Sequence, residues 1–168
     1  MRFSPVAIAL SLLAVVSAST GAAKVNDVVD PQTQTLLEAG RTQLAQGDIN
    51  AAVDSFEAAL TINPAYPATY LALGEAARRE GLQGKAIHYY RQALAREPNN
   101  LAAISGEGGA LAEKGALDKA KANLARLQGL CGKSCPEAAQ LAAVIAKGPA
   151  TKVVTAEAIK PAPKVEAN

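Results

Sequence analysis

The sequence contains no tryptophan, only two phenylalanines and a single histidine among its 168 residues. Aromatic and β-branched side chains, which strands favour, are also sparse from Thr33 to Lys147. Alanine supplies much of the hydrophobic content, and such small side chains suit helices that approach one another closely. The composition therefore favours an all-α fold and argues against a sheet.

The features that most enzymes need are absent as well. No second histidine is available to assist a serine or cysteine, and neither a glycine-rich phosphate loop after a strand nor a nucleophile elbow occurs. One histidine also falls short of the four ligands that zinc usually takes. His88 is expected on the outward side of a helix, where a solvated side chain needs no role. We therefore expect no enzyme, no metal and no other cofactor.

The charges are balanced, and neither sign forms a block. The chain has 17 Lys and Arg residues against 15 Asp and Glu residues. Nucleic acids and anionic membranes are both bound through a concentrated basic patch. Neither is therefore expected as the main partner.

Residues 1–23 have the pattern of a secretory signal peptide. Arg2 supplies the positive start, Val6 to Val16 form an apolar run too short to span a bilayer, and small residues follow. Cleavage after Ala18 and cleavage after Ala23 both fit the pattern. We expect a periplasmic or secreted protein with no stable membrane anchor.

The central part of the chain repeats with a period of 34 residues, as the spacing of Pro64 and Pro98 shows. A shift by this period brings similar residues into register in three units. The matching sets are Gly40, Gly74 and Gly108; Gly47, Gly81 and Gly115; Ala52, Ala86 and Ala120; and Phe56, Tyr90 and Leu124. This agreement predicts three similar supersecondary units.

Each residue type that recurs in the repeat has a physical reason to do so. A glycine inside a helix costs up to about 1 kcal/mol relative to alanine, so Gly40 and its equivalents are expected to allow a second helix to approach, with Ala52 and its equivalents facing them. Gly47 and its equivalents suit a left-handed turn after the first helix. Phe56 and its equivalents, Tyr90 and Leu124, have the larger side chains and are expected to pack between units. Pro64 and Pro98 end the second helices.

These residues resemble tetratricopeptide repeats (TPRs), with units 33–66, 67–100 and 101–134. The resemblance implies a right-handed superhelical stack of antiparallel helix pairs. The third unit departs from the pattern, because Glu107 replaces an apolar residue, Lys121 follows the small alanine, and Gly132 stands where proline is expected.

The segments outside the repeats are assigned from composition and periodicity. An apolar stripe at helical spacing predicts a helix over 136–147 that caps the open end of the stack. Residues 24–32 are expected to form a flexible leader. Residues 148–168, rich in Pro, Ala, Lys and Val, are expected to form a disordered tail.

The two cysteines, Cys131 and Cys135, are expected to form a structural disulfide in an oxidising compartment. Their three intervening residues and the absence of a preceding strand differ from thioredoxin-type motifs. The chain-entropy model gives so short a loop about 2 kcal/mol of stabilisation. A thiol-active redox protein that cycles this pair is the alternative.

The resemblance implies that the first helix of each pair lines a concave binding face. The inward positions that the resemblance implies as partner-binding residues are Gln34, Leu37, Arg41, Leu44, Leu71, Glu75, Arg78, Arg79, Ser105 and Glu113. Leu37 and Leu71 are expected as apolar contacts, and the arginines as anchors for carboxylates or as solubilising charges. Some family members clamp a C-terminal carboxylate with lysines and asparagines. Here Leu37, Arg41, Ala72, Ala102 and Gly106 occupy those positions, so such a ligand is disfavoured.

The sequence thus predicts a non-catalytic protein–protein interaction scaffold of the bacterial cell envelope that holds a peptide or protein segment. An assembly or secretion accessory fits this description. Self-association through the trough of Leu37 and Leu71 is a further alternative, which makes a homo-oligomer a candidate state.

Overall fold

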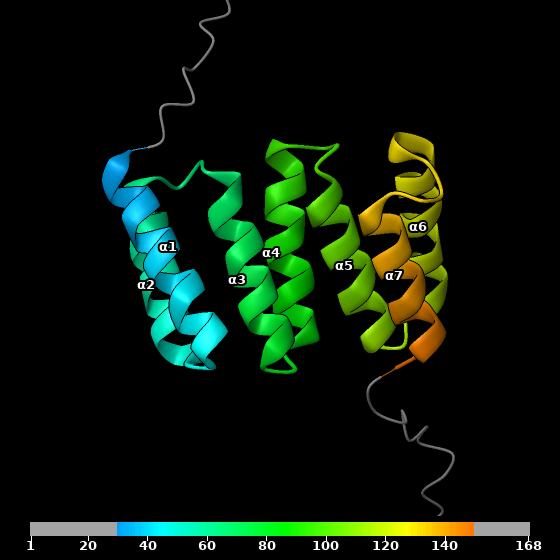
Figure 1. Ribbon diagram of the computed structural model, residues 1–168, viewed down its shortest axis with the longest axis horizontal. Helices are drawn as coiled ribbons and strands as arrows, with labels where there is room; N and C mark the ends of the chain where they lie inside the picture. Colours follow the sequence, from blue (N-terminus) through cyan, green and yellow to red (C-terminus); the bar gives the residue numbers. More distant parts are fainter. Residues whose placement is uncertain (1–29, 150–168) are drawn as a thin grey trace, which may run out of the picture.

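The computed structural model describes residues 30–149, which form seven α-helices and no strand (Figure 1). The helices are α1 (Pro31–Gln46), α2 (Ile49–Ile62), α3 (Pro67–Arg79), α4 (Gln83–Arg96), α5 (Leu101–Glu113), α6 (Leu117–Cys131) and α7 (Pro136–Lys147). The predicted signal peptide and all of the predicted tail beyond Pro149 lie outside the described residues.

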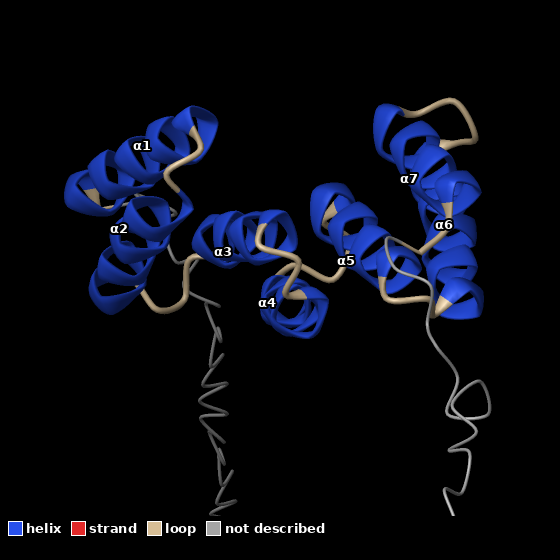
Figure 2. Ribbon diagram, turned by 90° about the horizontal axis from the view of Figure 1, so that it is seen from below, coloured by secondary structure: helices blue, strands red, loops and turns tan. Residues whose placement is uncertain are grey.

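Successive helices pack as the antiparallel pairs α1–α2, α3–α4 and α5–α6, and α7 packs against both α5 and α6. Figure 2 shows these pairs arranged in an arc, with α1 and α7 at its two ends and on the same side of α3. The predicted all-α stack of helix pairs is confirmed. The last helix, α7, has the bounds predicted for the capping helix.

The helix ends follow from local sequence. The Asp30 carboxylate accepts hydrogen bonds from the backbone N–H groups of Gln32 and Thr33, and Pro31 occupies the first helical position. The helix α1 therefore begins two residues before the predicted first unit, which corrects the end of the predicted leader, 24–32. Gly47 and Gly81 adopt the left-handed conformation expected of them, with φ of 86° and 77°.

The glycines inside the first helices do not face the small alanines that the sequence suggested. A Cβ atom on Gly40 would lie 2.4 Å from the Phe56 ring, and one on Gly74 would lie 2.8 Å from the Tyr90 ring. The glycines therefore make room for the aromatic side chains of the second helices. The expected partner of Gly40, Ala52, is fully buried, but the residue against the glycine is the larger one, four positions further along α2.

The third unit packs differently because α7 completes it. A Cβ atom on Gly108 would lie 2.6 Å from a methyl group of Leu141, which belongs to α7. Leu141 is fully buried in a cluster with Ile104 and Leu127, whereas Leu124, predicted to fill this role, is only half-buried at its edge. The capping helix thus supplies the bulky side chain that the third unit lacks.

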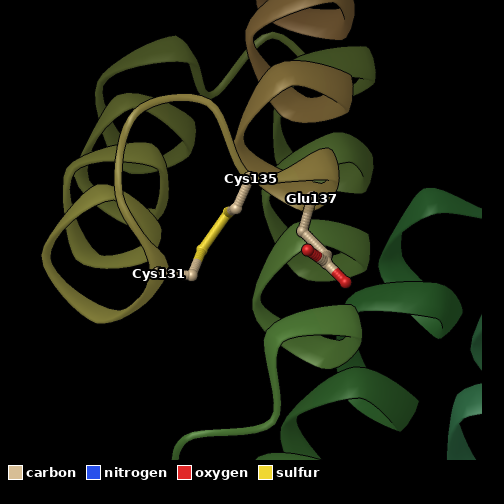
Figure 3. Close-up of side chains that lie close together, drawn as sticks. All are labelled: Cys131, Cys135 and Glu137. Atoms are coloured by element: carbon tan, nitrogen blue, oxygen red, sulfur yellow. A yellow bond between two sulfur atoms is a disulfide. The ribbon is translucent and has the colours of Figure 1, made fainter.

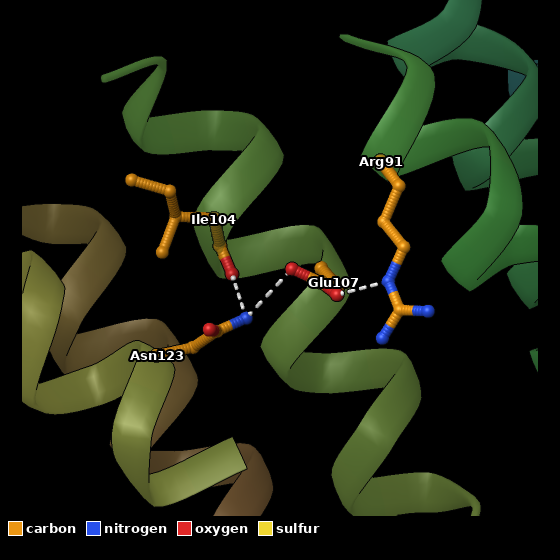
Figure 4. A network of polar contacts seen from close by, with 4 residues as sticks. All are labelled: Arg91, Ile104, Glu107 and Asn123. Atoms are coloured by element: carbon orange, nitrogen blue, oxygen red, sulfur yellow. Dashed lines mark hydrogen bonds and ion pairs between the residues drawn. The ribbon is translucent and has the colours of Figure 1, made fainter. Parts of the chain in front are cut away.

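Glu107, which breaks the repeat pattern, is buried but has polar partners from two neighbouring helices (Figure 4). One carboxylate oxygen accepts a hydrogen bond of 2.7 Å from the Arg91 guanidinium of α4, and the other accepts one of 3.1 Å from the Asn123 amide of α6. Asn123 also donates to the Ile104 carbonyl oxygen. The departure from the pattern therefore joins the second unit to the third through a satisfied polar network.

Within residues 30–149, none of the helices combines the length and the apolar character that crossing a membrane requires.

Candidate binding groove

The concave side of the arc contains a groove of about 370 Å³. It is formed by the four helices α1, α3, α5 and α7, and two aromatic side chains reach it from α2 and α4. The lining residues are Arg41, Leu44, Phe56, Ala68, Leu71, Ala72, Glu75, Arg78, Tyr90, Ala102, Ser105, Gly106, Glu137 and Gln140. The groove therefore combines an apolar floor with charged and polar groups at its walls.

Six of the ten predicted contact residues line this groove. They are Arg41, Leu44, Leu71, Glu75, Arg78 and Ser105. Gln34 is exposed on α1 but lies outside the groove. Arg79 and Glu113 line a smaller adjoining pocket of about 250 Å³ together with Glu75 and Arg78.

The prediction of Leu37 as an apolar contact is wrong. Its side chain is 2% exposed and packs in the cluster that contains Phe56 and Leu73. The helical turn places Leu37 against α2 and α3, so a partner in the groove does not reach it. The same burial excludes Leu37 from any surface that would join two copies of the chain.

Sequence reasoning missed the aromatic floor made by Phe56 and Tyr90. Both rings are buried, with Phe56 fully inaccessible and Tyr90 4% exposed, yet both border the groove. The signal was present in the glycines: Gly40 and Gly74 have no side chain, so the rings pack directly against the first helices, beneath the groove. The periodic glycines therefore determine the groove as well as the helix spacing.

Arg78 is not available as an anchor for a partner's carboxylate. Its guanidinium forms a two-pronged ion pair with Glu113 of α5, with N–O distances of 2.5 and 3.0 Å. This hydrogen bonding to Glu113 raises the pKa of Arg78 above its ordinary value, against the opposing effect of burial. Arg78 and Glu113 thus tie α3 to α5 across the groove wall.

Arg79 is also occupied, by groups of its own chain. One guanidinium nitrogen donates to the Leu44 carbonyl oxygen, near the end of α1, at 2.8 Å, and another contacts the Glu75 carboxylate at 2.6 Å. A cation at the last turn of a helix complements the helix dipole. The role of Arg78 and Arg79 as ligand anchors is therefore corrected to a structural one. Arg41 differs, because within the described part of the chain its ion pair is an exposed one with Glu38, and such pairs contribute about 0–1 kcal/mol.

The capping helix adds two polar residues that the sequence did not suggest, Glu137 and Gln140. The Ser105 hydroxyl donates a 3.1 Å hydrogen bond to the Glu137 backbone carbonyl. This bond fixes the start of α7 against α5. The groove is therefore formed by the four helices α1, α3, α5 and α7 together. Its last wall is α7, which lies outside the repeats.

Burial raises the pKa of the Tyr90 phenol to about 12, although the positive charge of Arg78 opposes this shift. An unfolded tyrosine ionises near pH 10, so between pH 10 and 12 the unfolded chain loses this proton more readily than the folded one. The stability that the neutral phenol contributes is present below pH 10. It is lost as the pH rises through the folded pKa.

We expect Tyr90→Phe to remove this alkaline sensitivity. Urea unfolding at pH 9 and pH 12 is expected to show that the wild-type chain loses about 2 kcal/mol more than the variant over this interval. Lysines and the other tyrosines titrate in both proteins, so the difference between the two isolates Tyr90. Equal losses in the two proteins would contradict the assignment.

The cysteines lie where α6 ends and α7 begins; neither lines the groove, but both are close to Glu137, which does (Figure 3). Cys131 and Cys135 are joined by a disulfide, and both are half-buried. A carboxylate oxygen of Glu137 lies within 4.8 Å of both sulfur atoms (Figure 3). His88 is exposed, as predicted, and touches only the edge of Tyr89 among the aromatic rings of the described chain.

Two family models match overlapping parts of the chain. One is described as a TPR repeat and matches residues 40–81, and the other is described as a tetratricopeptide repeat and matches residues 67–100. No curated protein sequence matches the chain.

Solved structures of low sequence identity share the fold. The Sgt2 TPR domain from Aspergillus fumigatus is 23% identical, with 83% of this chain and 91% of that one covered and a TM-score of 0.64. The Yersinia enterocolitica type III secretion chaperone SycD, in complex with a peptide of the translocator YopD, is 20% identical over 73% of this chain and 95% of that one, with a TM-score of 0.63. The TPR2B domain of yeast Sti1, in a complex with pHsp70, is 15% identical over 70% of this chain and 96% of that one, with a TM-score of 0.65.

Proposed function

We propose that this chain, which belongs to the tetratricopeptide-repeat family, is a non-catalytic scaffold that binds an extended peptide or protein segment in its concave groove. The observation that carries the proposal is the groove itself. It has an apolar floor of Leu44, Phe56, Leu71 and Tyr90 within a wall of polar groups. Apolar pockets with a few placed polar groups are typical of ligand sites.

The peptide-bound structures that resemble this chain support the class of ligand. SycD binds a segment of YopD, and the Sti1 domain is in complex with pHsp70. The carboxylate clamp that some family members use is not repeated here, because Ala72, Ala102 and Gly106 supply no polar side chain to the groove. We therefore propose an internal segment of the partner, rather than its C-terminus, as the ligand.

The proposed location is the bacterial cell envelope, after removal of the signal peptide predicted from the sequence. A role as an assembly or secretion accessory agrees with this location. The Cys131–Cys135 disulfide supports an oxidising compartment and a structural role, because it connects α6 to the helix that closes the core. The redox alternative has the weaker support, since the pair lies outside the groove where a partner would be held.

A bulky substitution at Ala102 is expected to abolish partner binding without unfolding the protein. Ala102 is an exposed residue of α5 that lines the groove, so Ala102→Trp fills the groove rather than the core. Ala125→Trp, at an exposed position of α6 outside the groove, is the matched control. The two variants and the wild type would be used to capture proteins from envelope extracts, followed by mass spectrometry.

We expect a partner that the wild type and Ala125→Trp retain and that Ala102→Trp loses. Melting curves of the three proteins check that the fold is unchanged. Capture of the same partners by all three would remove the groove from consideration as the binding surface. Capture of the chain itself would indicate the self-associating alternative.

A further inference from the structure

The charged residues that line the groove are almost all neutralised by residues of the same chain. Arg78 is paired with Glu113, and Glu75 is paired with Arg79. At the α1 end, Arg41 is paired with Glu38. Each guanidinium therefore has a carboxylate partner, although the exposed Arg41–Glu38 pair holds its two side chains only weakly.

Glu137 is the exception. Its carboxylate lines the groove and is half-buried, yet within residues 30–149 it has neither a hydrogen-bond donor nor an ion-pair partner. Its backbone is held by the hydrogen bond from Ser105, so the side chain starts from a fixed point on the groove wall. The groove therefore carries one unmatched negative charge at its α7 end.

Glu137 lies in the first turn of α7. A helix N-terminus favours a negative side chain through its dipole. This effect leaves the carboxylate oxygens free to accept hydrogen bonds, and a half-buried acceptor without a partner loses part of its hydration. Gln140, one helical turn further along α7 on the same wall, offers an additional carbonyl acceptor.

We propose that the groove selects a peptide segment in which an apolar side chain lies against Leu71, beside Tyr90, and a neighbouring Lys or Arg pairs with Glu137. This inference rests on the proposed function and adds the chemistry of its ligand. Glu137 is the specificity-determining residue of the site, because among the charged side chains that line the groove it alone has no ion-pair partner within residues 30–149. An acidic segment meets the same carboxylate and is rejected.

The test uses a random library of 12-residue peptides displayed on phage, selected on the full exported chain. The selected peptides are expected to share a Lys or Arg next to an apolar residue. The affinity of one such synthetic peptide is then measured by calorimetry for the wild type, Glu137→Gln and Glu57→Gln. Glu57 is exposed on α2 and outside the groove, so Glu57→Gln is the matched control.

We expect Glu137→Gln to bind the peptide about tenfold more weakly, and Glu57→Gln to bind it as the wild type does. Replacing the cationic residue of the peptide by norleucine should remove the difference between wild type and Glu137→Gln. Two outcomes would overturn this inference and leave the proposed function intact, provided that Ala102→Trp still excludes the peptides. In the first, the selected peptides show no cationic preference; in the second, they bind Glu137→Gln as tightly as wild type. Peptides that Ala102→Trp still binds would overturn both.

Discussion

A single methyl group added at Gly106 is expected to destabilise the fold by about 3 kcal/mol, at the upper end of the range for overpacked cores. A Cβ atom at this position would lie 2.4 Å from the Tyr90 ring. The ring has little room to move, because it is also packed against Gly74 of α3, where a Cβ atom would lie 2.8 Å from it. The gain in helix propensity from Gly to Ala, up to about 1 kcal/mol, offsets only part of this cost.

The matched control is Gly129→Ala, in the exposed part of α6. Nothing lies within 4 Å of a Cβ atom at Gly129, so the same substitution there is expected to stabilise the protein by up to about 1 kcal/mol. Denaturant unfolding of the two variants should give changes of opposite sign. Adding Tyr90→Leu to Gly106→Ala should cost less than the sum of the two single changes, because the smaller side chain removes the collision. Equal and small effects at both glycines would contradict the packing described above.

Truncation of Phe56 is expected to have the largest effect of all, a loss of about 3–5 kcal/mol for Phe56→Ala. The Phe56 side chain is fully buried against Gly40 in α1, and it also closes the floor of the groove. Its removal leaves a cavity that the surrounding helices cannot fill without moving the first unit.

The control occupies the same repeat position in the third unit. Leu124→Ala is expected to cost only about 1–2 kcal/mol, because Leu124 is half-buried and Leu141 of α7 occupies the place opposite Gly108. Denaturant unfolding at neutral pH measures both losses. A cost for Leu124→Ala as large as that for Phe56→Ala would show that the third unit does not depend on α7 for its bulky side chain.

These predictions depend on a core in which small residues and large ones alternate between helices. The alanine-rich composition first suggested that the small residues of both helices meet. The structure instead places each ring against a glycine, so a small number of aromatic and leucine side chains define the spacing of the whole stack. The same contacts bring two rings to the floor of the groove, which links the stability of the stack to the shape of its binding surface.

The 34-residue period by itself determined the helix pairs, the left-handed turns at Gly47 and Gly81, and the ends of α2 and α4 near the prolines. These features are local: a capping geometry or a proline acts on its own few residues, whatever the rest of the chain does. The periodic stripe of residues 136–147 likewise determined the last helix.

Only the tertiary structure decided which residues are available in the groove. Leu37 lies on a first helix, as expected, but the crossing of α1 with α2 and α3 buries it. Arg78 and Arg79 have partners on α5 and α1, 35 residues away in the sequence in each case. Glu137 reaches the groove because α7 packs on α5. Repeat position indicates the face of a helix, whereas burial and ion pairing depend on contacts between helices that are distant along the chain.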